Sequence, residues 1–176
     1  MSVAWSSVAT KGPWQEEKPS PAGLESYRMG VAGVAAEAVL WNGESMAISF
    51  YLRLASALGM GRETLGERLN DAGTRFLPCK TENRVEILNL NWISYIRVAG
   101  ILPEIAQLEE IGAARQRAKV VLQSGYFLEG EFLCVLPTER SRLSDFLNLG
   151  SERFLLFLAP AAVLYINRDS IVRVVT

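Results

Sequence analysis

Apolar residues are dense over residues 119–136, where their pattern is sufficient for two strands. Ser124 and Gly125 divide this stretch with residue types that favour a tight turn. Gly130 lies inside the second expected strand, and a glycine there indicates a bulge or a bend that lets a sheet curl. The pattern therefore predicts a bent hairpin.

The spacing becomes helical after this hairpin. Residues 140–148 place Leu143, Phe146 and Leu147 at i, i+3 and i+4, which puts them on one helix face. Three further strands are predicted at 154–158, 163–166 and 171–175. The expected order is strand, strand, helix and three strands.

The first half of the chain shows the same order. Asn42 and Gly43, a strong hairpin signal, separate predicted strands at 34–40 and 46–54. The pattern then predicts a helix at 63–70 and strands at 75–79, 84–90 and 93–98.

The two halves are also related residue by residue, at a constant offset of 78. Ten positions are identical without a gap, where unrelated sequences would share about two. The identical pairs are Arg62/Arg140, Leu65/Leu143, Leu69/Leu147, Asn70/Asn148, Arg75/Arg153, Phe76/Phe154, Leu77/Leu155, Val85/Val163, Asn89/Asn167 and Ile93/Ile171. Aligning Gly43 with Gly125 needs an offset of 82, so four extra residues are expected before the first helix. A fixed period of this kind predicts two copies of one small domain.

The repeat divides the chain into four parts. Residues 1–29, rich in Ser, Pro, Gly and charged residues, are predicted to be a flexible tail. Residues 30–98 and 118–176 are the two copies, and residues 99–117 connect them.

The connection is expected to contain a linker helix over residues 103–117 that lies on one copy. Pro103 is suited to a first helical position, and acidic residues precede arginines as the helix dipole prefers. Ile105, Leu108 and Ile111 form a narrow apolar stripe.

Short, bent strands that begin and end with hairpins are typical of a small closed barrel, because closure removes exposed sheet edges. The expected fold is therefore mainly β: two tandem five-stranded SH3-like barrels joined by a linker helix. Each barrel carries a short helix between its second and third strands.

The second copy resembles a known family. Its residues include the pattern Val120-x-Leu122-x-x-Gly125-x-x-Leu128-x-Gly130-x-Phe132. This pattern resembles the first signature of the Sm-like fold, which the Sm and LSm proteins share with the bacterial host factor Hfq. The second signature of that fold, a strand, a polar turn and a closing strand, is similar to residues 166–174. The resemblance covers most of 118–176 and, more faintly, 34–98, and it implies an Sm-like barrel in tandem.

The resemblance does not extend to the family's RNA site. Sm-like proteins read RNA with a loop between strands two and three and with an Arg-Gly or Lys-His pair in the second turn. Here that turn is Asn167-Arg168 or Asn89-Leu90, and a helix occupies the position between the strands. Only the barrel is therefore implied.

Composition and charge limit the expected partners and the expected cellular compartment. Hydrophobic residues make up 49% and charged residues 21%, with a net charge of −1, which gives no electrostatic reason to expect a nucleic acid or an anionic membrane. Cys79 and Cys134 lie in apolar runs and are expected to be buried free thiols rather than a disulfide. The chain starts without a signal-peptide pattern and has no apolar stretch of the ~20 residues a membrane span needs, so we expect a cytoplasmic protein.

The residue types argue against catalysis. The chain has no histidine, the commonest general base and metal ligand. It has no phosphate-binding glycine motif, and two distant cysteines do not make a metal site. We expect neither an enzyme nor a bound cofactor or metal.

The repeated apolar pairs are predicted to be core. Phe76 and Phe154 should occupy equivalent buried positions, packed on Leu69 and Leu147 respectively, because all four lie in matched apolar runs.

The repeated polar residues have structural and binding interpretations. Asn70 and Asn148 are expected to cap their helices, with ligand contact as the alternative.

Two arginines also recur at equivalent positions. Arg75 and Arg153 are expected to pair with Glu67 and Asp145 within each copy, with an anion site as the alternative.

Three aromatic residues are candidate interface positions. Tyr126 and Phe127 are adjacent in one strand and must point to opposite faces, so one of them is expected to be exposed. Trp41 lies beside the first hairpin turn.

These observations favour a non-catalytic module for protein–protein interaction or assembly, acting on a protein partner or on a second copy as a homo-oligomer. One alternative is an RNA or single-stranded nucleic-acid binding protein of Sm-like type. Its candidate contacts are Arg62, Arg68, Arg75, Arg84, Arg153 and Arg168. A second alternative is a small-molecule sensor with its ligand between the two barrels.

Overall fold

The structure is a computed structural model that describes residues 31–56, 61–82, 84–100, 102–136 and 142–176. The expected tail at 1–29 and part of the expected insertion before the first helix lie outside these residues. Ten strands and three α-helices are present in the described ranges, so the mainly-β class is confirmed.

The two copies have the same order of elements. The first contains β1 (Val31–Leu40), β2 (Ser45–Arg53), α2 (Leu65–Asn70), β3 (Phe76–Lys80), β4 (Val85–Asn89), the 3-10 turn η2 (Leu90–Trp92) and β5 (Ile93–Val98). The second contains β6 (Ala114–Leu122), β7 (Phe127–Cys134), α4 (Leu143–Leu149), β8 (Phe154–Ala159), β9 (Ala162–Asn167), the 3-10 turn η4 (Arg168–Ser170) and β10 (Ile171–Val175). The predicted order of strands and helix holds in both.

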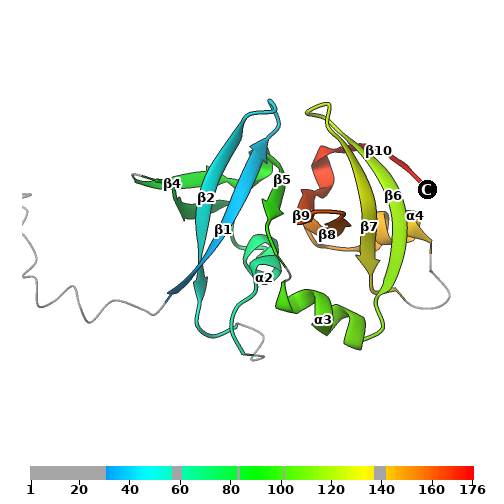
Figure 1. Ribbon diagram of the computed structural model, residues 1–176, viewed down its shortest axis with the longest axis horizontal. Coiled ribbons are helices and arrows are strands. Elements are labelled where there is room, and N and C mark those ends of the chain that lie inside the picture. Colours follow the sequence, from blue (N-terminus) through cyan, green and yellow to red (C-terminus); the bar gives the residue numbers. More distant parts are fainter. Residues whose placement is uncertain (1–30, 57–60, 83, 101, 137–141) are drawn as a thin grey trace, which may run out of the picture.

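All ten strands belong to one antiparallel sheet, with the order β10-β6-β7-β8-β9-β5-β1-β2-β3-β4. The strands of each copy stand in the same sequence, with the last strand beside the first. The two copies meet where β5 pairs with β9, in the middle of the molecule, and β4 and β10 lie at its opposite ends (Figure 1). The prediction of two separate closed barrels is not confirmed, because the copies share a single open sheet.

Glycines shape the hairpins as the sequence indicated. Gly43 and Gly125 turn the chain between β1 and β2 and between β6 and β7, with φ angles of 85° and 83° that favour glycine. A side chain at Gly130 would collide with the carbonyl oxygen of Leu158 on β8. Gly130 therefore allows β8 to approach β7 closely, and the pairing of β6 with β7 runs through it without a register shift, so the glycine does not form the bulge that the sequence suggested.

The linker helix α3 (Pro103–Glu110) is shorter than expected. Pro103 starts it, and Gly112, with a φ of 88°, redirects the chain so that β6 begins at Ala114. Ile105 is buried in the first core and Leu108 packs against that core, but Ile111 is exposed beyond the helix end. The apolar stripe is therefore correct for its first two members only.

Two apolar cores lie under the sheet, one for each copy. The first core contains residues of β2, α2 and β5, and the second contains residues of β6, β7 and β8. Cys79 lies in the first core and Cys134 in the second, and both are free thiols as expected. Within the described residues, no helix is long and apolar enough to cross a membrane.

Candidate functional site at the joint and the open edges

The joint, meaning the β5–β9 pairing and the side chains packed over it, connects the two copies. The register runs from Tyr95 opposite Ile166 to Val98 opposite Val163. Neighbouring strand residues point to opposite faces, so each strand sends side chains into both cores. Ile96 and Tyr165 lie in the first core, whereas Tyr95 and Ile166 lie in the second.

The second copy completes the first core. Phe154 on β8 and Val163 and Tyr165 on β9 are all buried in that core. The Tyr165 hydroxyl donates a hydrogen bond to Glu104 Oε1 on α3. Burial, together with the nearby Glu104 carboxylate, raises the pKa of Tyr165 above its ordinary value. The linker helix and the second copy are thus tied to the same core.

The first copy in turn covers part of the second core. Val39 and Tyr95 belong to that core. The Tyr95 ring packs edge-on against Tyr126, with a centroid distance of 5.8 Å. The Tyr126 hydroxyl lies 3.5 Å from the Gly43 carbonyl oxygen, which it approaches as a donor. Tyr126 therefore contributes to the joint inside the molecule.

Side chains hydrogen-bonded to backbone hold the joint in register. Asn70 Oδ1 accepts a hydrogen bond from Phe154 N at 2.7 Å, and Asn70 Nδ2 donates to Phe154 O at 3.0 Å. The expected helix-capping role of Asn70 is wrong, since its amide binds a strand 84 residues away. Asn148, the equivalent residue, donates to Ser144 O at 2.7 Å, four residues back within α4.

Two further residues bind across the joint. Arg153 Nη1 donates to Thr74 O at 2.9 Å. Asn167 Nδ2 donates to Ile93 O at 2.8 Å and to Leu90 O at 3.3 Å. These buried or partly buried bonds therefore give the carbonyl oxygens of Thr74, Leu90 and Ile93 a side-chain donor from the second copy.

Among the described residues, the strands at the two ends of the sheet have a neighbouring strand on one side only. We call β4 and β10 the open edges, because each is the outermost strand of the sheet. Phe76 is 55% exposed where Phe154 is 2% exposed, Val85 is 61% exposed where Val163 is 6%, and Ile87 is 69% exposed where Tyr165 is 2%. The expectation that Phe76 is buried is therefore wrong, whereas that for Phe154 is confirmed.

The expected packing partners of the two phenylalanines are wrong, because the exposed Phe76 is outside the first core and Phe154 lies in the first core with Leu69 rather than on Leu147. Leu69 is buried in the first core, and Leu147 is partly buried against the second. The β10 edge exposes Val172 and Val175. Both edges thus combine unpaired backbone with exposed apolar side chains.

Of the three aromatic candidates, Phe127 is 72% exposed and Tyr126 is 40% exposed, although the Tyr126 ring also packs on Tyr95 at the joint. Trp41 is half-buried beside Trp92, with ring centroids 6.0 Å apart. The Trp41 Nε1 is buried and has no hydrogen-bond partner. The sequence predicted one exposed residue in the Tyr126–Phe127 pair, but both are exposed, because β7 begins at Phe127 and Tyr126 lies in the preceding turn.

The candidate arginines are separated and mostly engaged within the protein. Arg68 pairs with Glu63 at 3.7 Å, and Arg84 pairs with Glu86 at 2.9 Å. Arg168 donates to the Gly150 carbonyl oxygen. Arg62 is exposed near the start of α2. With Arg153 bound across the joint, these side chains do not form one basic surface.

The expected pairs of Arg75 with Glu67 and of Arg153 with Asp145 are wrong. Glu67 closes a capping box on α2, accepting from Thr64 N at 2.9 Å, and it also accepts from Ser56 Oγ at 2.7 Å. Its carboxylate is therefore already used locally. Arg75 instead lies over the Phe76 ring, with its guanidinium carbon 5.6 Å from the centroid.

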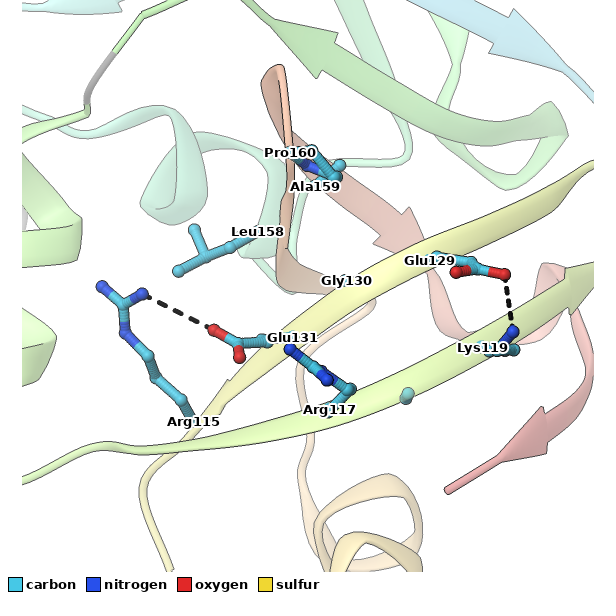
Figure 2. Close-up of a pocket in the computed structure, with 10 residues that line it drawn as sticks. Arg115, Arg117, Lys119, Glu129, Gly130, Glu131, Leu158, Ala159 and Pro160 are labelled. Atoms are coloured by element: carbon cyan, nitrogen blue, oxygen red, sulfur yellow. Dashed lines mark ion pairs between the residues drawn. The ribbon is translucent and has the colours of Figure 1, made fainter.

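A shallow hollow lies on the outer face of β6, β7 and β8, where Gly130 lets the strands approach (Figure 2). Charged side chains from β6 and β7 form ion pairs along it: Lys119 Nζ is 2.7 Å from Glu129 Oε1, and Arg115 Nη1 is 3.5 Å from Glu131 Oε2. Such exposed cross-strand pairs are ordinary sheet-surface contacts. The hollow brings together no acid–base pair with a nucleophile.

No family model, curated protein or solved structure matches this chain. Among the described residues, no group of three or more Cys, Asp or Glu side chains is placed to hold a metal ion. The joint and the open edges are therefore the features from which a function is inferred.

Sequence reasoning missed Val85, Ile87, Val163 and Tyr165 as functional positions. The fourth strand of the second copy is apolar at every position of 163–166, and that of the first copy is apolar at every position of 85–88 except Glu86. Such a strand is typical of burial on two sides. That pattern is the signal that could have identified them.

Proposed function

We propose that the protein is a non-catalytic module for protein–protein interaction or assembly, built from two tandem small barrels of Sm-like or SH3-like type. The strand order supports this proposal, because within each copy the last strand lies beside the first and each copy has a core of its own. A curled five-stranded unit of this kind presents its outer strands to neighbours rather than enclosing a ligand.

The observation that carries the proposal is the pair of open edges. An unpaired strand offers a row of backbone donors and acceptors, and soluble proteins usually blunt such edges with charges, proline or a cover. On β4, Val85 and Ile87 are instead exposed apolar residues. An edge with this composition is suited to adding a strand from another protein.

The other two functions have less support. Five of the six candidate arginines, all but the exposed Arg62, bind carboxylates, carbonyl groups or a ring of this protein, so little basic surface is left for phosphates. A small molecule between the copies would need space that Phe154, Val163 and Tyr165 fill. These facts favour assembly over nucleic-acid binding and over small-molecule sensing.

The proposal is tested with three forms of the full chain: wild type, Ile87→Lys on the β4 edge, and Ile111→Lys as a control. Ile111 is as exposed as Ile87 but lies between α3 and β6, away from both edges. Size-exclusion chromatography with light scattering, together with capture of proteins from lysate, measures binding. We expect wild type and Ile111→Lys to bind a protein partner or another copy and Ile87→Lys to bind weakly. Binding that is absent in all three forms, or equal in all three, contradicts the proposal.

A further inference from the structure

We propose that copies of this chain associate head to tail, with β4 of one copy pairing antiparallel with β10 of the next. This inference rests on the proposed assembly function and names its partner as a second copy of the chain. The pairing repeats, between molecules, the β9–β5 pairing that joins the two repeats within the molecule.

The repeat offset fixes the register. β4 is the equivalent of β9, and β10 is the equivalent of β5, because each pair stands 78 residues apart. The observed pairs are Tyr95–Ile166, Ile96–Tyr165 and Arg97–Leu164. Each β5 residue is replaced by its equivalent on β10, and each β9 residue by its equivalent on β4. The intermolecular pairs are Leu88 opposite Arg173, Ile87 opposite Val174, and Glu86 opposite Val175.

The exposed apolar residues of β4 match this arrangement. At the joint, Tyr165 and Val163 enter the core of the neighbouring repeat. Their equivalents Ile87 and Val85 are exposed on β4, on the face opposite to Leu88, which packs on its own core. In the proposed contact both side chains lie against the second repeat of the neighbour, where Val174 already packs on the core.

Residue sizes at the new contact are complementary. At the joint, Gly66 on α2 lies under the Tyr165 ring, and a Cβ there would be 3.4 Å from the ring carbon Cε1. The equivalent of Gly66 is Ser144 on α4, which has a side chain. The equivalent of Tyr165 is Ile87, which is smaller than tyrosine. At the proposed contact, the larger Ser144 in place of glycine therefore faces the smaller Ile87 in place of tyrosine.

The polar groups that hold the joint recur at the open edges. Asn70, Asn167 and Arg153, which bind backbone across the joint, have the identical equivalents Asn148, Asn89 and Arg75. Asn89 even keeps the local contact of its counterpart, since its Oδ1 accepts from Asn91 N at 3.1 Å as Asn167 Oδ1 accepts from Asp169 N at 3.1 Å. The three residues are thus preserved in the copy where they bind nothing across a joint.

The two asparagines have definite expected partners on the neighbouring copy. Asn148 is placed to bind the backbone N and O of Phe76, as Asn70 binds those of Phe154. Asn89 is placed to donate to the carbonyls of Arg168 and Ile171. The two repeats would then share these surface residues because each set stabilises the same kind of strand pairing, one within the molecule and one between molecules.

A second copy is the best occupant because the two edges differ and complement each other. One molecule carries the β9-like edge and the β5-like edge at opposite ends, so the contact is heterologous and each copy binds two neighbours. Exposed Arg173 on β10 also lies diagonal to Glu86 of the neighbour in the stated register, within reach of a long side chain. Such contacts continue until a ring closes or a filament forms.

Cysteine cross-linking tests the register directly. Full-length Ile87→Cys is mixed with full-length Val174→Cys under mild oxidation, and Glu86→Cys mixed with Val174→Cys is the control, one position out of register and on the opposite strand face. Opposite residues of antiparallel strands lie within disulfide range, at a Cα separation of about 4.5 to 5.5 Å. The native Cys79 and Cys134 are buried and stay in place.

We expect a disulfide-linked dimer from the in-register mixture and at least about tenfold less from the control. We also expect light scattering of the wild type to show association that rises with concentration. Asn148→Ala and Ile87→Lys should each weaken this association by about tenfold or more, as changes at the centre of an interface do, whereas Ile111→Lys should not. Circular dichroism confirms that the exposed-edge variants are folded.

Two results overturn the inference. Self-cross-linking of Ile87→Cys in the absence of Val174→Cys would mean that β4 pairs with β4. A wild type that remains monomeric at every concentration would exclude head-to-tail association. If that monomer still captures another protein through the Ile87 edge, the proposed function stands and only this inference fails; if no edge-dependent capture occurs, both fail.

Discussion

β9 and β4 hold the same place in two copies of one small fold, yet one is buried on both faces and the other is the bare end of the sheet. Their sequences are similar in pattern: residues 163–166 are all apolar, and residues 85–88 are apolar except for Glu86. The difference comes from the neighbouring strand: β5 pairs with β9, whereas no strand of the described part of the chain pairs with the outer side of β4. Burial of a strand in a repeat is thus decided by its place in the array as well as by its residues.

The same comparison extends to polar residues. Asn70 binds the backbone of Phe154 across the joint, whereas Asn148 turns back to its own helix. A residue that stabilises one copy is therefore available for another contact in the other copy. The following experiments, made at concentrations where the chain is monomeric, test this difference between the copies.

The largest expected difference in the free energy of unfolding is between alanine variants of the two equivalent phenylalanines. Phe154→Ala should reduce the free energy of unfolding by about 3 to 5 kcal/mol, because it removes a large side chain from the first core. Phe76→Ala should change it by less than about 1 kcal/mol, because that ring is largely exposed. Chemical denaturation followed by fluorescence measures both. Equal losses for the two variants would mean that β3 and β8 have the same environment.

The next largest difference in the free energy of unfolding is expected between alanine variants of Asn70 and Asn148. Asn70→Ala should cost about 1 to 3 kcal/mol of unfolding free energy, since it leaves a donor and an acceptor of the partly buried Phe154 backbone without partners. Asn148→Ala should cost less than about 0.5 kcal/mol, because its bond to Ser144 O is exposed. Thermal unfolding of both variants provides the measurement. A loss of the same size in Asn148→Ala would show that the helix-end bond, not the joint, is what matters.

The stability of the joint should fall at alkaline pH because of Tyr165. The folded state holds the pKa of this hydroxyl above its ordinary value, so the resulting stabilisation is complete below about pH 10 and is lost as the pH rises further. Above that pH the unfolded chain binds fewer protons than the folded one, and the slope is at most about 1.4 kcal/mol per pH unit.

Tyr165→Phe, which cannot ionise and cannot bind Glu104, is the variant for comparison. Denaturation at pH 8, 10 and 11 should show a shallower alkaline loss in Tyr165→Phe than in the wild type. Tyr95, whose pKa burial also raises, remains in both proteins and cancels in the comparison. Parallel pH profiles would place the Tyr165 hydroxyl in solvent.

The smallest difference expected is between the two cysteines. Burial raises the pKa of Cys134 to about 12 and also raises that of Cys79, so neither thiol should react with a disulfide reagent at pH 8 until the protein unfolds. Cys79 lies on β3 beside the open β4 edge, and Cys134 lies on β7 within the second core. Labelling in increasing denaturant should expose the two together. Earlier labelling of Cys79 would show that the open edge loosens the first copy.

Local sequence patterns determined the elements and their order. The hairpins follow from Gly43 and Gly125, and the helix of the second copy follows from Leu143, Phe146 and Leu147, because turns and apolar helix faces are set by residues close in the chain. The repeat was visible for the same reason, since it is a property of the letters alone. The linker helix was predicted too long because Gly112 was overlooked as its end.

The tertiary structure alone decided which member of each equivalent pair is buried. Asn70 was predicted to be a cap and Phe76 to be core, because sequence reasoning treated each copy as a closed unit. The contacts that overturn both predictions join residues 84 positions apart or depend on the absence of a strand beyond β4. The sequence determined two similar units; how they share one sheet, and which edges remain open, depends on long-range pairing that no local pattern encodes.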